Sequence, residues 1–187
     1  MALSITGGAL RGRRFAAPKG KGVRPTAAKV REALFSILGQ RLDGYAVLDL
    51  CAGTGALGLE AASRGADRVV FVEQSREHLR QLRSNAELLG DATEVSVQGG
   101  DARRAPGRLA DGGERFDLVF LDPPYRTGLA AEVLEAIGAH AAALLHDDAR
   151  VVVETAFDEE LPLSVGDLRC KDPRRYGETR IWIFEGS

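Results

Sequence analysis

From Tyr45 onward, apolar and polar positions follow two patterns that alternate along the chain. Unbroken apolar runs predict buried strands, and apolar residues spaced three and four positions apart predict helices. The predicted strands cover residues 45–50, 68–73, 93–98, 116–122, 150–155, 168–172 and 179–185. The predicted helices cover residues 56–64, 75–90, 103–110 and 128–145. This alternation is typical of an α/β fold with a mostly parallel sheet and helices on both of its faces.

The end of the chain departs from this alternation. The last two predicted strands, 168–172 and 179–185, have no helical segment between them. We therefore expect them to form a closing hairpin in which one strand runs antiparallel to the rest of the sheet.

The N-terminal segment, residues 1–39, departs from it as well. LSITGGALRGRRF predicts a β-hairpin whose bend lies near Gly7-Gly8 or Gly12. Thr26 is expected to cap a helix that runs to about Leu38, where Gly39 follows as a terminating glycine. The sequence thus predicts an appendage over residues 1–39 and an α/β body over residues 40–187.

The overall composition is that of a globular protein, with 187 residues of which 44% are hydrophobic and 28% charged. No apolar run approaches the roughly 18 residues of a membrane-spanning helix, and no signal peptide opens the chain. Cys51 and Cys170 lie far apart and match no metal or redox spacing. We expect a cytoplasmic monomer with reduced thiols, without a membrane segment and without a metal.

Charge is distributed unevenly, although the net charge is only −2. Residues 1–31 carry eight basic side chains and no acid, so the other residues together carry a net charge of −10. Contacts with phosphates need local rather than global positive charge, so this segment favours a nucleic-acid partner. A solvated basic arm would have the same composition, and charge alone does not decide between the two.

A glycine-rich turn follows the first predicted strand, within LDLCAGTGALGLE (residues 48–60). Gly53, Gly55 and Gly58 fit the spacing G-x-G-x-x-G between a strand and a helix. Glycines there allow a tight turn and the close approach of a ligand to the backbone, beside a helix N-terminus. The turn predicts a nucleotide-like ligand at the carboxyl edge of the sheet, although glycines that only turn the chain would look the same.

Acidic residues at strand ends narrow the choice of ligand. Glu73 ends the second predicted strand, where an acid accepts hydrogen bonds from ribose hydroxyls, which indicates adenosine. Asp49, just before the glycine turn, would repel a pyrophosphate but attract the ammonium group of a methionine moiety, directly or through water. This favours S-adenosylmethionine over a dinucleotide. Asp101, after the third strand, could reach the adenine amino group or cap the following helix.

The fourth predicted strand ends in DPPY, residues 122–125. Prolines stop a strand because they donate no backbone hydrogen bond, so Asp122 and Tyr125 stand on a stiff turn. Asp122 and the carbonyl of Pro123 can accept from the two N–H bonds of a planar amine and draw electron density onto its nitrogen. Tyr125 offers a face for stacking a base, worth about 1–3 kcal/mol. The turn predicts methyl transfer to a nucleobase amine, although an ordinary turn at a strand end is the simpler alternative.

These segments together resemble the class I S-adenosylmethionine-dependent methyltransferases, and more closely the RsmD family, which methylates N2 of a guanine in 16S ribosomal RNA. The resemblance spans nearly the whole chain. It rests on ITGGALRGRRF, VRPTAAKVREALFSIL, VLDLCAGTGALGLEAASRGA, FVE, the DA at 101–102, FDLVFLDPPYRTGL and VVVE. It implies a Rossmann-like, seven-stranded sheet whose last strand is antiparallel. The chain departs from the family at Cys51, where an aromatic residue is common.

The resemblance also implies site residues and a substrate, the 16S rRNA of the small ribosomal subunit or its precursor. Catalysis is expected at Asp122, Pro123, Pro124 and Tyr125. Cofactor contacts are expected at Asp49, Ala52, Gly53, Thr54, Gly55, Glu73, Asp101 and Ala102. Contacts with RNA phosphates are expected from Arg11, Arg13, Arg14 and Arg24, with looser contacts from Lys19 and Lys21. Arg31 is expected instead to pair with Glu32 or with an acid of the body.

Three alternatives stay open at this stage. The same turn serves adenine in DNA adenine-N6 methyltransferases, although 187 residues leave no evident target-recognition domain. An RNA-binding ribosome assembly factor could keep the fold with little activity. A dinucleotide oxidoreductase is the third, but the sequence places no catalytic His or Lys for it.

Overall fold

The computed structural model describes residues 2–17, 28–170 and 173–186. The chain forms two compact units, Met1–Gly99 and Gly100–Ser187. The predicted boundary near residue 39 therefore lies inside the first unit, and the RNA-contacting role of residues 1–39 stays a prediction. The proposed cap at Thr26 lies outside the described residues.

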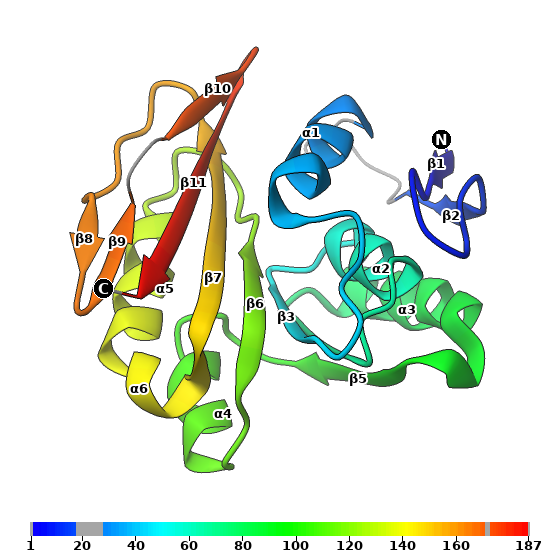
Figure 1. The fold of residues 1–187 in the computed structure, drawn as a ribbon, viewed down its shortest axis with the longest axis horizontal. Helices are drawn as coiled ribbons and strands as arrows, with labels where there is room; N and C mark the ends of the chain where they lie inside the picture. The colour runs from blue at the N-terminus through cyan, green and yellow to red at the C-terminus, as the bar shows by residue number, and fades with distance from the viewer. Residues whose placement is uncertain (1, 18–27, 171–172, 187) are drawn as a thin grey trace. The chain divides into compact units, whose positions relative to one another are not determined.

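Among the described residues of the first unit, strands of one sheet run parallel to one another, with helices packed on them (Figure 1). Its elements in chain order are β1 (Ala2–Ser4), β2 (Arg14–Ala16), α1 (Ala28–Leu38), β3 (Ala46–Leu50), α2 (Ala56–Ser63), β4 (Arg68–Glu73), α3 (Arg76–Ala86), the 3-10 helix η1 (Glu87–Ala92) and β5 (Glu94–Gly99). Strand β4 lies between β3 and β5 and runs parallel to both. The carboxyl ends of the three strands therefore lie at one edge of this sheet.

Helix α2 is buried along nearly its whole length, because small and apolar residues occupy every side of it. A Cβ at Gly58 would lie only 2.2 Å from Cε1 of Phe71, so the helix and strand β4 approach more closely than a side chain would permit. Helix α3 is amphipathic, with Leu79 and Leu82 buried, and Ser75 caps it by accepting a hydrogen bond from the His78 amide. Its α-helical part ends at Ala86, earlier than predicted, and Gly90 has a left-handed φ of 57°.

The N-terminal strands β1 and β2 pair antiparallel, with Leu3 opposite Phe15, so the predicted hairpin is confirmed. Its connection is a long loop over residues 5–13 rather than a tight bend. Helix α1 ends as predicted: Gly39 has φ 112°, and its amide donates to the carbonyl of Phe35.

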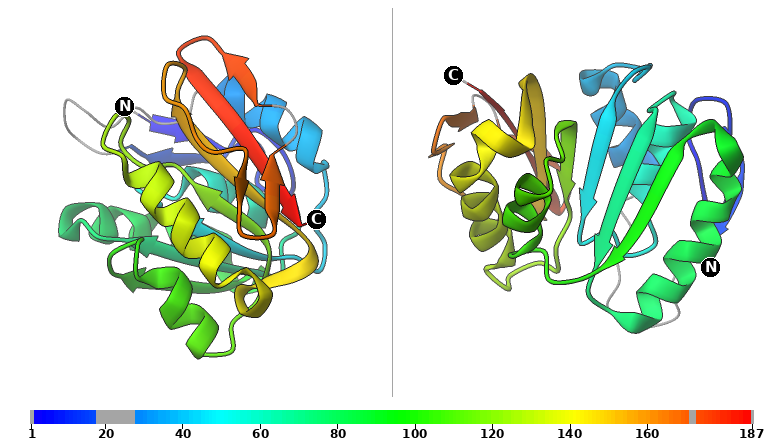
Figure 2. Two further views of the ribbon diagram at one scale, coloured as in Figure 1. Left: turned by 90° about the vertical axis from the view of Figure 1, so that its left-hand side faces the viewer. Right: turned by 90° about the horizontal axis from the view of Figure 1, so that it is seen from below.

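The second unit holds the remaining strands and three helices. Its elements are α4 (Ala105–Asp111), β6 (Phe116–Leu121), α5 (Leu129–Ala139), α6 (Ala141–Leu144), β7 (Leu145–Ala156), β8 (Ser164–Val165), β9 (Leu168–Cys170), β10 (Arg174–Tyr176) and β11 (Thr179–Gly186). Strand β6 is parallel to β7, and β11 lies antiparallel between β7 and β9. The prediction of an antiparallel closing strand is confirmed. Figure 2 shows α5 beside the short β8–β9 hairpin.

Some boundaries in the second unit differ from those predicted. The expected helix over 128–145 is divided at His140, whose backbone leaves the helical region (φ −114°, ψ 9°). Strand β7 begins at Leu145, which pairs with Phe116, rather than at residue 150. Strands β8 and β10 were not predicted. Residues 171 and 172 of the predicted strand 168–172 lie outside the described residues.

The predicted fold class is confirmed, and all seven predicted strands of the body are present as β3, β4, β5, β6, β7, β9 and β11. Strands β4, β6 and β7 contain unbroken apolar runs of the sequence, and in β6 the side chains of Leu118, Val119, Phe120 and Leu121 are all fully buried. Strand β5, by contrast, has no buried residue. Among the described residues, none of the helices has both the length and the apolar character needed to cross a bilayer.

Candidate active site

The glycine turn between β3 and α2 is fixed by backbone hydrogen bonds. The amide of Ala52 donates to the carbonyl of Val72 on β4, at 3.1 Å, and the amide of Gly55 donates to Ala52 at 2.7 Å. Thr54 is buried, and its carbonyl accepts from Nδ2 of Asn85 at 3.0 Å. The turn is therefore bound to both β4 and α3, which gives it a defined shape.

The three glycines of the motif have different roles. A Cβ at Gly55 would lie 2.5 Å from Cδ1 of Leu82, and one at Gly58 would overlap Phe71, so both serve close packing. A Cβ at Gly53 would meet nothing nearer than the carbonyl oxygen of Cys51, at 3.9 Å. Gly53 is thus the glycine of the motif whose backbone borders open space. It is the position where a ligand can approach the chain, as a nucleoside cofactor requires.

Glu73 lies at the end of β4 and holds the glycine turn from the side. Its Oε2 accepts from the amide of Gly53 at 2.8 Å, and its Oε1 accepts from the amide of Ser75 at 2.7 Å. Each carboxylate oxygen has two lone pairs, so both oxygens keep capacity for a further hydrogen bond. These groups fit the two adjacent hydroxyls of a ribose next to Gly53.

Asp49 lies beneath the turn, with only 1% of its surface exposed. Its Oδ2 accepts from the amide of Gly58 at 2.9 Å, near the start of α2. Burial raises the pKa of Asp49 to about 7, the Gly58 amide opposes this, and the charge of Glu73 adds to it. In this structure Asp49 secures the junction of strand and helix, and the attraction for an ammonium group that the sequence suggested stays a prediction.

Asp101 and Ala102 open the second unit. The Asp101 side chain accepts from the Arg103 amide at 2.9 Å, and its backbone carbonyl accepts from the amides of Arg104 and Ala105. The carboxylate also pairs with the Arg103 guanidinium at 3.2 Å. Ala102 is buried. Asp101 therefore closes the turn that precedes α4. The N-cap of that helix is Arg104, without a side-chain hydrogen bond, so Asp101 does not cap the helix as the sequence allowed, and its contact with an adenine stays a prediction.

The DPPY turn follows β6 directly. Asp122 is half-buried, Pro123 is buried and Pro124 is exposed. The hydroxyl of Thr127 donates to the carbonyl of Pro124 at 2.8 Å, so that carbonyl is already engaged within the turn. This contact holds the turn in shape, and the role of the Pro123 carbonyl beside Asp122 in accepting the hydrogens of an amine stays a prediction.

Tyr125 is anchored by two groups from other strands. Its hydroxyl donates to Oε1 of Glu154, on β7, at 2.6 Å, and lies 2.9 Å from the Thr179 hydroxyl on β11. Burial raises the pKa of Tyr125 well above its usual range, and the charge of Glu154 raises it further. The ring is therefore a neutral, oriented surface, which suits it for stacking on a base.

The residue after the tyrosine is held as well. Arg126 has a left-handed φ of 57°, which is unusual for a residue with a side chain. Its amide donates to Oε1 of Glu159 at 2.7 Å, and its guanidinium pairs with Asp158 at 2.9 Å. Glu159 also accepts from the Ala156 amide, so the loop after β7 supports the turn after β6.

The predicted RNA-contacting residues divide into two groups, and Arg31, which was expected to pair with an acid instead, lies apart from both. Arg11, Arg13 and Arg14 are exposed on the N-terminal loop and β2. Lys19, Lys21 and Arg24 lie outside the described residues. Arg31 is 1% exposed and lies 3.7 Å from Glu60, so its expected structural pairing is confirmed with an acid of α2 rather than with Glu32.

The sequence alone did not identify the residues that support the turn. Glu154, Thr179 and Glu159 contact it only because β6, β7 and β11 pair in one register. The signal available was an acid at the end of the apolar run VVVE, Glu154, and a run of three acids shortly after it, residues 158–160. None of these acids has a spacing that points to the turn.

The fold and the turn together define a class of protein. A putative methyltransferase, yhhF from Escherichia coli, superposes with a TM-score of 0.82 at 32% identity and covers 100% of this chain and 99% of that one. A putative methylase from Haemophilus influenzae superposes with a TM-score of 0.80 at 26% identity, with the same coverage. The chain therefore has an α/β methyltransferase fold.

The family model of conserved hypothetical protein 95 matches residues 3–185, and the chain belongs to this family, which is the RsmD family. The putative rRNA methyltransferase YlbH of Bacillus subtilis is 34% identical over 183 residues, 98% of each chain. The ribosomal RNA small subunit methyltransferase D of Escherichia coli strain K12 is 37% identical over 164 residues, 86% of this chain and 78% of that protein.

Proposed function

We propose that this protein methylates the exocyclic N2 amine of a guanine in 16S ribosomal RNA, with S-adenosylmethionine as the cofactor. The observation that carries the proposal is the anchored turn after β6, in which Asp122 precedes two prolines and an oriented tyrosine. The names of the two relatives support rRNA as the substrate, and the name of the Escherichia coli relative specifies the small subunit. The choice of guanine N2 rests on the resemblance to the RsmD family. A substrate of this kind is made in the cytoplasm, where we expect the protein to act.

The residues that would hold the cofactor are those of the glycine turn and the strand ends. Glu73 would accept from its ribose hydroxyls, the Gly53 backbone would border it, and Asp101 would accept from its adenine amino group. When bound, the cofactor supplies an electrophilic methyl group on a sulfonium with a good leaving group. Positioning and exclusion of water then account for most of the rate that the protein must provide.

Asp122 and the carbonyl of Pro123 would accept from the two N–H bonds of the target amine. Both contacts draw electron density onto a nitrogen whose lone pair is otherwise delocalised into the ring. Tyr125 would stack on the base after it leaves its own stack. The nitrogen would form one bond to the methyl carbon while the bond from that carbon to sulfur breaks, so that sulfur leaves as a neutral thioether and the nitrogen becomes strongly acidic. It then releases one proton, which Asp122 can accept or pass to water, so no strong base is needed.

We expect Asp122→Ala to lower methyl transfer by about 10²-fold or more, because the amine loses an oriented acceptor. Asp122→Asn, which keeps one acceptor, should lose less. The measurement is transfer of label from the cofactor to deproteinised 16S rRNA and to small subunits, with affinity for S-adenosylhomocysteine followed by calorimetry. Asp111→Asn, an exposed change at the end of α4, is the control and should leave both quantities unchanged. Full activity of Asp122→Ala would contradict the assigned role.

A second candidate is methylation of adenine N6 in DNA, because the same turn suits any planar amine. Duplex DNA in the same labelling experiment separates the two candidates, since label found only in adenine would identify adenine rather than guanine as the target.

An assembly factor with little activity is tested in cells. If Asp122→Ala preserves cellular function while the modification is lost, the protein acts chiefly as an assembly factor. Mass spectrometry of rRNA from a deletion strain would locate the modified nucleotide.

A further inference from the structure

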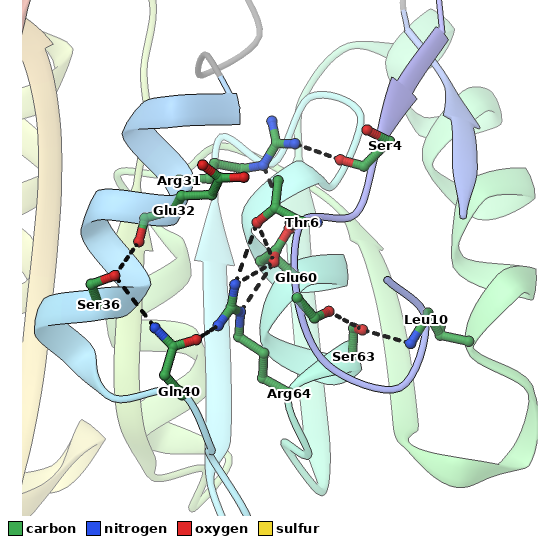
Figure 3. A network of polar contacts seen from close by, with 11 residues as sticks. Ser4, Thr6, Leu10, Arg31, Glu32, Ser36, Gln40, Glu60, Ser63 and Arg64 are labelled. Atoms are coloured by element: carbon green, nitrogen blue, oxygen red, sulfur yellow. Dashed lines mark hydrogen bonds and ion pairs between the residues drawn. The ribbon is translucent and has the colours of Figure 1, made fainter. Parts of the chain in front are cut away.

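The N-terminal loop is fastened to helix α2 by buried polar contacts. Glu60 of α2, which is fully buried, accepts from the amide of Thr6 at 2.8 Å and from its hydroxyl at 2.7 Å (Figure 3). Arg64, which is also buried, pairs with the same carboxylate at 2.8 Å. A buried charge of this kind is strongly bound to its partners, so the loop has a defined position at Thr6.

Ser63, one turn after Glu60, holds the next part of the loop. Its hydroxyl donates to the carbonyl of Gly7 at 2.6 Å and accepts from the amide of Leu10 at 2.9 Å (Figure 3). Its carbonyl accepts from the amide of Ala9 at 2.7 Å. A Cβ at Gly8 would lie 1.8 Å from that carbonyl oxygen, so the loop runs directly over the helix backbone. The loop that carries Arg11 and Arg13 is therefore a fixed part of the first unit, not a solvated arm.

Strand β2 is fastened in turn to helix α3. The side chain of Asn85 accepts from the amide of Ala16 at 3.1 Å and donates to its carbonyl at 3.0 Å. The same amide group donates to the carbonyl of Thr54 in the glycine turn. Arg14, two positions before Ala16, is consequently held beside α3 and stays exposed.

Helix α3 presents an arginine face of its own. Arg76, Arg80 and Arg83 are exposed and lie one helical turn apart, around a surface hollow that Leu79 also lines. Arginines at this spacing repel one another and destabilise a helix by about 0.2–0.5 kcal/mol per pair. Within the part of the chain that the structure describes, these three guanidinium groups form no ion pair. Other exposed arginines do: Arg41 pairs with Asp43, Arg103 with Glu132, and Arg126 with Asp158.

We propose that the arginines of α3 and those of the N-terminal segment form one phosphate-binding surface for the RNA substrate. This arginine surface comprises Arg11, Arg13, Arg14, Arg76, Arg80 and Arg83. It begins beside Glu73, because α3 starts directly after that strand end, and it continues to β2 through the contacts of Asn85. The proposal rests on the proposed function, since it assigns a new contact surface to the same RNA substrate. Arginine is suited to the role because its planar guanidinium binds phosphate oxygens in pairs.

The test compares two double variants that lower the net charge equally. Arg80→Glu/Arg83→Glu alters the arginine surface, and Arg104→Glu/Arg108→Glu alters two exposed arginines at the start and on the surface of α4. Binding to deproteinised 16S rRNA and to small subunits is measured across a salt series, together with binding of S-adenosylhomocysteine. For the α3 variant we expect affinity for RNA to fall about tenfold at moderate salt, and the salt dependence to flatten by about 1.4–1.8 in log–log slope. The α4 variant should behave as the unaltered protein does.

Arg80→Gln/Arg83→Gln removes charge without adding acids and should show a smaller loss in the same direction. Unchanged binding of S-adenosylhomocysteine in all variants shows that the fold is kept. Methylation at the normal rate in the α3 variants would contradict the proposal that the arginine surface binds RNA, while leaving the proposed function intact. Equal losses in the α3 and α4 variants would also overturn it. If the unaltered protein neither binds nor methylates either RNA but binds anionic phospholipid vesicles through these arginines, both proposals fail.

Discussion

At the scale of single residues, the tyrosine of the turn depends on a buried acid from another strand. Glu154 is 4% exposed, and its carboxylate receives the hydrogen bond from Tyr125 while Thr179 lies next to both. An aromatic ring that stacks on a base needs a fixed plane, and this contact fixes the end of the ring that faces the protein. Under the proposed function, Glu154 would orient the stacking residue without contacting the base.

We expect Glu154→Ala to lower methyl transfer by about tenfold, because the loss of a hydrogen bond to a charged group costs about 1.5–3 kcal/mol. Affinity for S-adenosylhomocysteine should not change. Glu154→Gln should recover part of the activity because its side-chain oxygen can still accept. Spectroscopic titration gives an independent readout, since the pKa of Tyr125 should fall when the Glu154 charge is removed. The single variants Glu154→Gln and Tyr125→Phe are compared with the double variant Glu154→Gln/Tyr125→Phe. If the loss of activity in the double variant equals the sum of the two single losses in free energy, the two residues do not act as a pair.

Asp49 gives the stability a distinct dependence on pH. The pKa of this carboxyl is about 7 in the folded protein and near 3.8 in the unfolded chain. Between these values the unfolded chain has lost a proton that the folded protein keeps, so Asp49 lowers the free energy of unfolding as pH rises from about 4 to 7. Asp49→Asn has no ionisable group at this position, so its free energy of unfolding does not show this decrease. We expect the variant to gain stability relative to the unaltered protein across that window and to show a constant difference above it.

Urea denaturation at a series of pH values measures this quantity. A difference between the two proteins that is already constant between pH 4 and 7 would show that Asp49 ionises at its ordinary pKa. Asp111→Asn serves as the control, because Asp111 is exposed and its change should have no such pH dependence.

At the scale of elements, α2 and β4 approach each other through a glycine. Gly58→Ala should lower the free energy of unfolding by about 1–3 kcal/mol, because its methyl group would overlap the buried ring of Phe71. Gly100→Ala is the matched control, since a Cβ at Gly100 meets nothing within 4 Å. Thermal or urea denaturation of both variants checks the prediction. Equal stability of the two would mean that Phe71 moves aside freely.

The elements could be predicted from sequence where their pattern is long and regular. Strands such as β6 are unbroken apolar runs, because both of their faces are buried. Strands β8 and β10 have two and three residues, too few for any periodicity to appear. Helix boundaries depended on local backbone geometry at Gly90 and His140, which the hydrophobic pattern does not encode.

The parts of the candidate site that could be predicted are those whose residues are contiguous in sequence. The DPPY turn and the glycine turn are contiguous in sequence, so their chemistry is readable there. Their supports are not contiguous: Leu121 pairs with Val153, and only this register brings Glu154 near Tyr125. The attachment of the N-terminal loop to Glu60 was likewise invisible, because an acid within an apolar helix gives no indication of its partner.

At the scale of the whole molecule, the local charge of one surface differs in sign from the net charge of the protein. A sequence pI near 6.0 describes an acidic protein, yet the first unit has exposed arginines both on its N-terminal segment and on α3. Association with RNA depends on the local potential, so its response to salt should follow the arginine surface rather than the net charge. Composition alone would have argued against such a partner.

The attachment of the N-terminal loop has a consequence for protein engineering. Residues 2–17 are not a portable module, since their position depends on a carboxylate and a hydroxyl three residues apart on a helix of the catalytic body. Grafting them onto another enzyme would transfer the arginines but not their orientation. A recipient would need equivalents of Glu60 and Ser63 at matching places, and chimaeras that lack them should gain charge without gaining recognition.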